Sequence, residues 1–399
     1  MRVALVLALA CGCTAPSGDC ARADLAPPPR APAYALVASD YSSSAIGLLD
    51  TDGSVITAAW LDSGARPPGV VAALSGDVVL PTAPFAPCTV VLVDRFGTDV
   101  VSWLDPCGGE PVRGQLDVGR SLASNPHDVL RVGAAAWVTR YGVGLGAAAD
   151  SIERGNDVVV VEGGRIARRI DLGALADDGE TFARPDRMAR IGPAGAEQVV
   201  VGLGRLSADF MRTGPGAVAL VDPRTLEARL VPIAGLSGCG ELDPIGEVVV
   251  VTCQGEAFGD AAARRARAGV VALGLDGAGG LVERAAFRAA EHPSLPVPTG
   301  PTIALAEDRW LTVAFGDIPA GTPDRALGIA RGQAEVWLEA APFTLGEGVY
   351  DAAHDLLLLP DAGASVIRRL RGDGTEREPI DATGCHGLPP REIARVAFP

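Results

Sequence analysis

Three polar pairs that follow a proline at matching points of the chain are the residues best placed to do chemistry. The pairs are His127-Asp128, Asp186-Arg187 and Arg391-Glu392. A histidine beside a carboxylate could act as a general base with its orienting group. The other two pairs hold different residue types at the same position. We therefore favour a structural turn or a hydrogen bond between neighbouring repeats over a catalytic role.

Each pair lies in a seven-residue segment that recurs without gaps. The segments are Pro126–Val132, Pro185–Ile191 and Pro390–Val396. Each begins with Pro, continues with polar residues and ends in an apolar-x-Arg-apolar pattern. Recurrence across the whole chain marks the same strand in copies of one structural unit.

Runs of strand-forming residues fill the intervals between these segments, and turn pairs such as Asp-Gly separate them. Predicted second strands are Tyr34–Ala38, Asp77–Leu80, Ala136–Tyr141, Gln198–Leu203, Glu247–Thr252, Trp310–Phe315 and Asp355–Leu359. Predicted third strands are Ile46–Gly53, Val90–Gly97, Val158–Gly163, Val218–Arg224 and Val270–Gly277, with fourth strands such as Ile56–Leu61 and Val100–Leu104. Four short strands per unit are typical of β-propeller blades.

One of these units carries a resemblance to a known family. Tyr34–Tyr41, followed by Ile46–Gly53, resembles the YVTN family of β-propeller repeats. The segment Trp137–Gly142 is similar to the tetrapeptide that names the family. The resemblance implies an all-β propeller over residues 33–399, and it brings no common set of catalytic residues.

The blade starts fall near residues 68, 126, 185, 242, 298, 346 and 390, which predicts seven blades, with eight as the main alternative. The last start has no strands after it, and the blade of Tyr34–Leu61 has no inner strand before it. We therefore expect Arg391–Phe398 to be the inner strand of that first blade, which closes the ring and leaves no open edge.

The N-terminus predicts export. Met1-Arg2 is followed by an apolar run, Val3–Ala10, and then by Cys11 and Cys13. This pattern is typical of a secretory signal, and it resembles bacterial lipoprotein signals, in which a Cys is lipidated. We predict a signal peptide over residues 1–12, lipidation of Cys13 (or Cys11) and a flexible tether over residues 13–32. The expected location is extracytoplasmic, anchored in the periplasm or at the outer membrane, or secreted if the signal is an ordinary one.

The other cysteines predict disulfides. Cys88 and Cys107 are equally distant from the turn pair Gly97-Thr98, so pairing Phe96 with Asp99 puts Asp94 opposite Val101 and the two cysteines opposite each other. Cys239 and Cys253 should end strands on one face of the propeller. Cys385 then has Cys20 in the tether as its partner. Lipidation of Cys13 would leave these six cysteines in three pairs.

Composition excludes several classes of function. The net charge is −15 and the sequence contains no Lys, which excludes lysine Schiff-base catalysis and a Walker-type phosphate loop and disfavours nucleic-acid binding. No Cys-x-x-Cys occurs and the histidines are scattered, so we predict no metal centre. Asp50–Gly53 resembles a calcium loop without its distal Glu, and we interpret it as a hairpin turn. Ca²⁺ binding stays an alternative, and no other cofactor is expected.

Long insertions predict where binding occurs. Val143–Asn156, Arg205–Pro215, Gln254–Ala268 and Asp317–Asp324 should all emerge on one face, together with the starts of the inner strands. The candidate ligand-binding residues are His127, Asp128, Arg140, Asp186, Arg187, Arg205 and Asp317. We favour a monomeric binding scaffold that uses this face for a protein or cell-envelope ligand. The alternatives are a structural spacer and a propeller enzyme, either a calcium-dependent lactonase-like hydrolase or a quinoprotein, with its site at the channel mouth.

Overall fold

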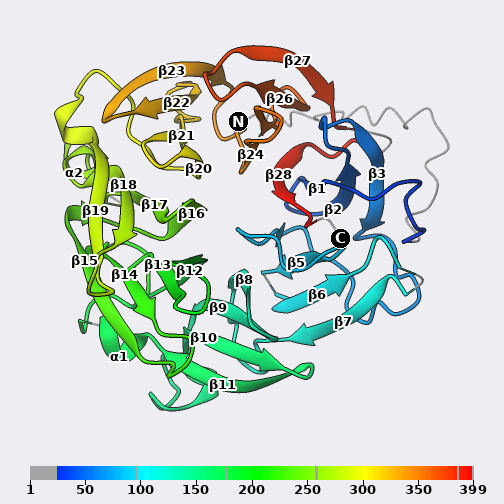
Figure 1. Cartoon of the computed structure of the whole chain (residues 1–399), viewed down its shortest axis with the longest axis horizontal. Helices are drawn as coiled ribbons and strands as arrows, with labels where there is room; N and C mark the ends of the chain where they lie inside the picture. The colour runs from blue at the N-terminus through cyan, green and yellow to red at the C-terminus, as the bar shows by residue number, and fades with distance from the viewer. Residues whose placement is uncertain are drawn as a thin grey trace, which may run out of the picture.

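The structure is a computed structural model, and it describes residues 25–95, 97–108, 110–176, 178–256, 259–383 and 386–397. Within these residues the strands form seven four-stranded sheets. The sheets stand as blades around a central axis, and one strand of each blade lies at the inside of the ring (Figure 1). The prediction of an all-β, seven-bladed propeller is therefore confirmed.

We number the blades from the N-terminus and give the strands of each from the inside outward. Blade 1 contains β28 (Pro390–Arg395), β1 (Tyr34–Ser39), β2 (Ser44–Leu49) and β3 (Val55–Asp62). Blade 2 contains β4 (Val78–Val79), β5 (Val90–Asp94), β6 (Val100–Leu104) and β7 (Val112–Asp117). Blade 3 contains β8 (Pro126–Val132), β9 (Ala135–Val143), β10 (Gly155–Glu162) and β11 (Arg165–Asp171). Blade 4 contains β12 (Pro185–Ile191), β13 (Gln198–Leu203), β14 (Pro215–Val221) and β15 (Ala228–Ser237).

The last three blades follow the same order. Blade 5 contains β16 (Glu241–Ile245), β17 (Val248–Gln254), β18 (Ala268–Leu275) and β19 (Leu281–Arg288). Blade 6 contains β20 (Thr302–Ala306), β21 (Arg309–Ala314), β22 (Asp324–Ala330) and β23 (Gln333–Ala340). Blade 7 contains β24 (Val349–Asp351), β25 (Leu356–Asp361), β26 (Val366–Leu370) and β27 (Glu376–Asp381). Helices α1 (Gly173–Ala176) and α2 (Ala261–Ala266), and the 3₁₀ turns Ile152–Arg154 and Ala289–Glu291, lie in connections.

The ring is closed by the C-terminal strand, as the sequence predicted. Strand β28 pairs antiparallel with β1, and the register sets Arg395 opposite Tyr34 and Ile393 opposite Leu36. In Figure 1 the last strand therefore lies beside the first. Both edges of β1 are paired, because β2 covers the other side.

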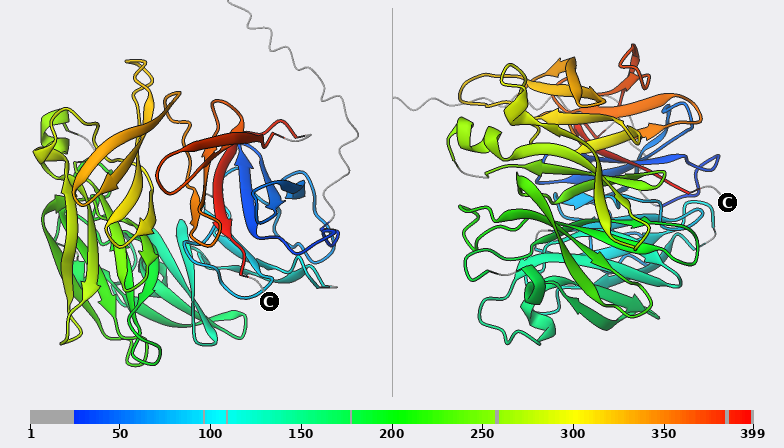
Figure 2. Two further views of the ribbon diagram at one scale, coloured as in Figure 1. Left: turned by 45° about the horizontal axis from the view of Figure 1, so that its top comes forward. Right: turned by 60° about the vertical axis from the view of Figure 1, so that its left-hand side comes forward.

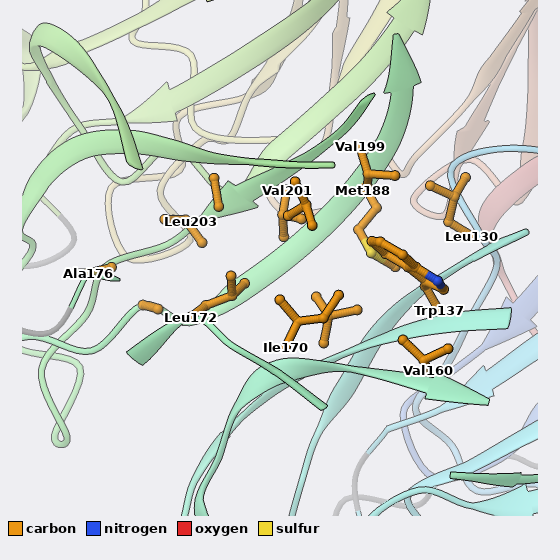
Figure 3. Packing of buried hydrophobic residues seen from close by; sticks show 14 of the residues in the cluster. Leu130, Trp137, Val160, Ile170, Leu172, Ala176, Met188, Val199, Val201 and Leu203 are labelled. Atoms are coloured by element: carbon orange, nitrogen blue, oxygen red, sulfur yellow. The ribbon is translucent and has the colours of Figure 1, made fainter. Parts of the chain in front are cut away.

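The hydrophobic core lies between the faces of adjacent blades. Leu130 and Trp137 of blade 3 pack with Met188 and Val201 of blade 4, and all four side chains are buried (Figure 3). Burial of each large apolar side chain contributes about 1.5–3 kcal/mol. Because every blade shares its core with two neighbours, the ring holds each inner strand in a fixed position.

Blade 2 departs from the prediction. Asp77–Leu80, expected as a second strand, contains the inner strand β4, and Val90–Asp94 and Val100–Leu104 are the second and third strands. The blade therefore starts about ten residues after the predicted position near 68. The physical reason is that β4 has only two residues and no proline-led segment. Its residues therefore give too weak a pattern to mark the start of the blade after the long link that precedes it.

Two of the predicted disulfides are confirmed. Cys88 is bonded to Cys107, and Cys239 is bonded to Cys253. The predicted register of the first pair is wrong by one residue, because Asp94 pairs with Val100 and not with Val101. Cys88 and Cys107 lie beyond the paired residues of β5 and β6, so their contact does not depend on the strand register. The predicted partners Cys20 and Cys385 lie outside the described residues.

The predicted signal peptide, the lipidation residues Cys11 and Cys13, and residues 13–24 of the tether also lie outside the described residues. The described end of the tether contacts blade 1. Leu25 is buried, its backbone N–H donates to the carbonyl of Trp60, and the Trp60 indole donates to Ala26. Among the residues described, none of the helices has the length and apolar character needed to span a bilayer.

Candidate functional site at the channel mouth

The four predicted insertions all connect the second and third strands of a blade, so they emerge on one face, which we call the loop face. They join β9 to β10, β13 to β14, β17 to β18 through α2, and β21 to β22. Figure 2 shows α2 projecting from one side of the disc. The links between blades and the starts of the inner strands lie on this face too, so side chains at those starts surround the channel mouth.

Arg187 of β12 is the centre of this region. Its guanidinium donates to the carbonyls of Leu80 at 2.9 Å and His127 at 3.3 Å, which belong to blades 2 and 3. It also forms ion pairs with Glu241 at 3.5 Å, with Glu392 at 3.4 Å and with Glu347. These carboxylates belong to blades 5 and 1 and to the link before blade 7. One buried side chain of blade 4 therefore joins residues at or next to the inner strands of five other blades.

Carboxyl groups outnumber the cation around which they gather. Burial raises the pKa of Glu241 to about 7, and the nearby Asp186 adds to this shift. Burial also raises the pKa values of Glu347 and Glu392, although Arg187 opposes the change. With a pKa of about 7, Glu241 can exchange a proton close to physiological pH.

His127 and Asp186 form a second polar contact, between blades 3 and 4. Nδ1 of His127 lies 2.6 Å from Oδ1 of Asp186, and the imidazole stacks on Tyr141 with 4.3 Å between ring centroids. Burial lowers the pKa of His127. Burial opposes ionisation of Asp186, but His127 and Arg187 outweigh it and lower its pKa. A neutral imidazole that donates Nδ1–H to a carboxylate has Nε2 as an acceptor, which is the form of a general base.

A cavity of about 330 Å³ opens beside Arg187 at the mouth, and we call it the mouth cavity. Charged and polar side chains make part of its wall, and aromatic rings make another part. The lining includes Ser39, Tyr41, Asp77, Arg95, Arg187, Glu241, Gln254, Phe315, Phe343, Glu347, Arg391 and Glu392. This size and this mixture of groups fit a small molecule.

Of the seven predicted site residues, Arg187 lines the mouth cavity, and His127 and Asp186 contact each other next to Arg187. The other four lie apart from it. Asp128 is buried and accepts backbone N–H groups of Thr82, Val129 and Met188. Arg140 is fully buried and makes a bidentate pair with Asp157 at 2.7 and 2.8 Å.

Arg205 and Asp317 belong to the long loops. Arg205 is buried and donates to the carbonyl of Ala176 and to Asp178. Asp317 caps its own loop by accepting the N–H of Ala320. Of the seven candidates, the structure thus brings His127, Asp186 and Arg187 together at the mouth.

Glu241, Glu347 and Glu392 belong to this site but were not among the site residues predicted from the sequence. Glu241 is the first residue of β16, a position equivalent to the polar pairs, and this was a usable signal. Glu347 precedes a three-residue strand, β24, and has no recurring motif around it. Within the described part of the chain, no three His, Cys, Asp or Glu side chains are arranged as a metal site. Asp50–Gly53 forms the turn between β2 and β3, in which the Gly53 N–H donates to the Asp50 carbonyl.

The fold and the mouth define a β-propeller with a polar site at one end of its channel. The chain is similar to a periplasmic gluconolactonase from Pseudomonas aeruginosa, with 16% identity, a TM-score of 0.56, and coverage of 92% of this chain and 99% of that one. It is also similar to a Bacteroides fragilis protein whose assignment as a 6-phosphogluconolactonase is provisional, with 12% identity, a TM-score of 0.54, and coverage of 92% and 98%.

A third similar structure is a hypothetical selenium-binding protein from Sulfolobus tokodaii, with 9% identity, a TM-score of 0.59, and coverage of 95% of this chain and 99% of that one. At such identities these similarities show the fold alone. No protein-family model matches the sequence, and no curated protein is similar to it. The resemblance to YVTN repeats therefore stays a prediction from the motifs.

The carboxyl cluster predicts an unusual dependence of stability on pH. Because the folded pKa of Glu241 is about 7 and thus above its ordinary value, the folded state holds a proton that the unfolded chain releases. The stability that this bound proton adds is therefore fully present at pH values below the ordinary pKa of a glutamate, and it is lost as the pH rises through about 7. Urea unfolding should show a stability that is lower at about pH 8 than at about pH 5 by about 1–3 kcal/mol.

Two variants test the origin of this effect. Glu241→Gln cannot titrate at this position and should make the pH profile less steep, while Glu347, Glu392 and Asp243, whose pKa values burial also raises, keep part of the dependence. Glu197→Gln, which changes a half-exposed carboxylate paired with Arg190, should leave the profile of the unmodified protein in place. A profile that is identical in both variants would mean that Glu241 is not the group responsible.

Proposed function

We propose that this protein is an exported binding module, held at the cell envelope by a lipid on Cys13, that recognises a protein or envelope partner through its loop face. Two disulfides and the similarity to a periplasmic protein support an extracytoplasmic location. The ion pairs that occupy Arg187 support a structural role for the centre of the mouth. Binding at the surrounding loops is therefore the first candidate.

The observation that carries this proposal is the distribution of exposed apolar side chains. Among the described residues, seven of the nine large exposed ones lie in the loops or blade-to-blade links of the loop face, and two lie on outer strands: Tyr41, Val71, Leu145, Phe210, Met211, Ile318 and Phe343 in the first group, and Val282 and Val336 in the second. Tyr41 is 67% exposed and Ile318 is 65% exposed. Single exposed apolar residues are ordinary, but their concentration on one face is typical of an interaction surface.

A matched pair of variants tests the proposal. The double change Phe210→Ser and Met211→Ser removes two exposed side chains from the loop face. The control, Val282→Ser and Val336→Ser, removes two comparably exposed side chains from the outer strands β19 and β23. We expect the first variant to bind cell envelopes of the producing organism at least about tenfold more weakly, which corresponds to about 1.4 kcal/mol. Equal binding by both variants, or no binding by the unmodified protein, would refute the proposal.

Labelling with a radioactive fatty acid tests the anchor. Cys13→Ser should abolish the labelling, and Cys11→Ser should leave it in place. The opposite result would move the anchor to Cys11. If the unmodified protein is not labelled, lipidation is excluded. Fractionation of the cells then locates the labelled protein.

A second candidate function is hydrolysis at the mouth, and the contact between His127 and Asp186 favours it. A neutral His127 could accept a proton from water, and a protonated Glu241 could donate one to a leaving oxygen. Two structures of similar fold carry lactonase names, which makes gluconolactone a reasonable first substrate. We expect Asp186→Asn to slow its hydrolysis about 10²-fold, while Glu197→Gln changes nothing. A rate no higher than that of the spontaneous reaction would exclude this candidate.

A further inference from the structure

The mouth cavity has an aromatic wall built from three separate segments. Phe315 follows β21, Phe343 lies in the link from blade 6 to blade 7, and Tyr41 lies between β1 and β2. The rings of Phe315 and Phe343 are stacked nearly parallel, at 8°, with 5.3 Å between centroids. Phe343 is 53% exposed and Tyr41 is 67% exposed. Exposed aromatic faces beside a cavity offer flat apolar contact to a ring-shaped ligand.

The rest of the wall is mixed, since Val78, Val79 and Leu345 line it together with polar side chains that include several acceptors. Glu241 and Asp77 carry carboxyl groups, and Gln254 carries an amide. Planar carboxyl and amide groups can each contact two adjacent hydroxyl groups, and an amide both donates and accepts. A saturated ring with hydroxyl groups has an apolar C–H face and a polar edge, so it matches both parts of this wall.

The charged side chains of the wall are paired within the protein, which favours an uncharged ligand. Arg95 is paired with Asp77 at 2.6 Å, and Arg187 is paired with three glutamates. Arg391 donates to the carbonyls of Ser39 and Phe343, and it lies over the Tyr41 ring at 4.8 Å.

Each arginine among the described lining residues is therefore engaged within the protein. Four carboxyl groups, Asp77, Glu241, Glu347 and Glu392, face three arginines. A phosphate or carboxylate on the ligand would lose its hydration in this partly buried cavity, where each guanidinium already has partners in the protein.

We propose that the mouth cavity is a binding site for a small uncharged ligand with a hydroxyl-bearing saturated ring, of the monosaccharide type, and that it rejects phosphorylated forms of the same ring. This inference concerns a different part of the loop face from the apolar side chains at residues 210 and 211. It also requires no hydrolysis. It shares Tyr41 and Phe343 with the first candidate function and the mouth with the second, but the variants at residues 210, 211 and 186 test those functions separately.

The test is ligand-observed saturation-transfer NMR and titration calorimetry on the purified mature protein. The probes are glucose, galactose, mannose, N-acetylglucosamine and glucose 6-phosphate. We expect at least one neutral sugar to bind in the millimolar range. Glucose 6-phosphate should bind at least about tenfold more weakly than that sugar, because its phosphate would lose hydration without gaining a guanidinium that is free of partners.

Two variants identify the site of binding. Phe343→Ala should weaken binding of the neutral sugar about tenfold through loss of the stacking surface. Val336→Ala, on the outer strand β23, should leave the affinity unchanged and controls for general effects on the blade. The proposal is overturned if no neutral sugar binds, if glucose 6-phosphate binds equally well or better, or if Phe343→Ala has no effect. Circular dichroism melting of both variants checks that each is folded.

Discussion

Replacing Arg187 with methionine is expected to lower the free energy of unfolding by about 3–5 kcal/mol near neutral pH. Methionine keeps much of the volume of the side chain but removes the charge that Glu241, Glu347 and Glu392 surround. These buried carboxyl groups would lose their counter-charge, and the carbonyls of Leu80 and His127 would each lose a donor. Removing one partner of a buried ion pair lowers the free energy of unfolding by much more than the intact pair adds to it relative to apolar residues in the same place.

A control on the same strand separates this effect from a general loss of charge. Arg190 lies three residues further along β12, its side chain is 47% exposed, and it pairs with Glu197 at 3.4 Å. Arg190→Met should cost less than about 1 kcal/mol, because exposed ion pairs contribute little. Urea unfolding of both variants gives the comparison. Equal losses would show that the centre of the mouth contributes no more than a surface pair.

The pH dependence of the Arg187→Met variant gives an independent check. Without the guanidinium, the pKa values of the surrounding carboxyl groups should rise further, because the interaction that opposes burial is gone. The variant should therefore lose more stability at about pH 8 than at about pH 5. A loss that is the same at both pH values would point to packing and not to charge.

The fold could be predicted because its signals are local and repeated. The proline-led segments at Pro126 and Pro185 mark two inner strands with the right boundaries, and the segment at Pro390 marks a third that ends at Arg395, before the predicted end at Phe398. The closure could be predicted from the number of strands in each unit. The C-terminal strand had no blade of its own, and the blade of Tyr34–Leu61 had no inner strand. Blade 2 was misplaced because β4 is two residues long. A strand that short is held by its neighbours, and its own residues carry almost no pattern.

The site could be predicted only in part, because its contacts join residues that are far apart in the sequence. Arg187 and Glu347 are 160 residues apart, and only the closed ring brings them together. The sequence placed Asp186 and Arg187 at the start of an inner strand, and it favoured a structural role for such pairs. The hydrogen bonds from Arg187 to blades 2 and 3 agree with that interpretation. No local spacing could show that three carboxyl groups meet one guanidinium.

Removing residues 390–399 is expected to abolish cooperative folding, and this is the largest effect that we predict. The deletion removes β28, and with it the buried side chains of Ile393 and Val396. It also exposes the inner edge of β1, whose residues are buried, to solvent in the channel. An unpaired apolar edge strand is prone to aggregate. The truncated chain should accumulate as insoluble protein, or show a broad thermal transition by circular dichroism.

Two further chains make this test specific to the closure. A chain that lacks only residues 398–399 keeps all of β28 and should melt like the unmodified protein. In the second chain, Ala35 and Ala394, which the register sets opposite each other, are both replaced by cysteine. Opposed positions lie within reach of a disulfide, so oxidation should link them and raise the melting temperature, because the link closes a very long loop in the unfolded chain. If the two cysteines do not link, or if the longer truncation melts normally, β28 does not hold the ring closed.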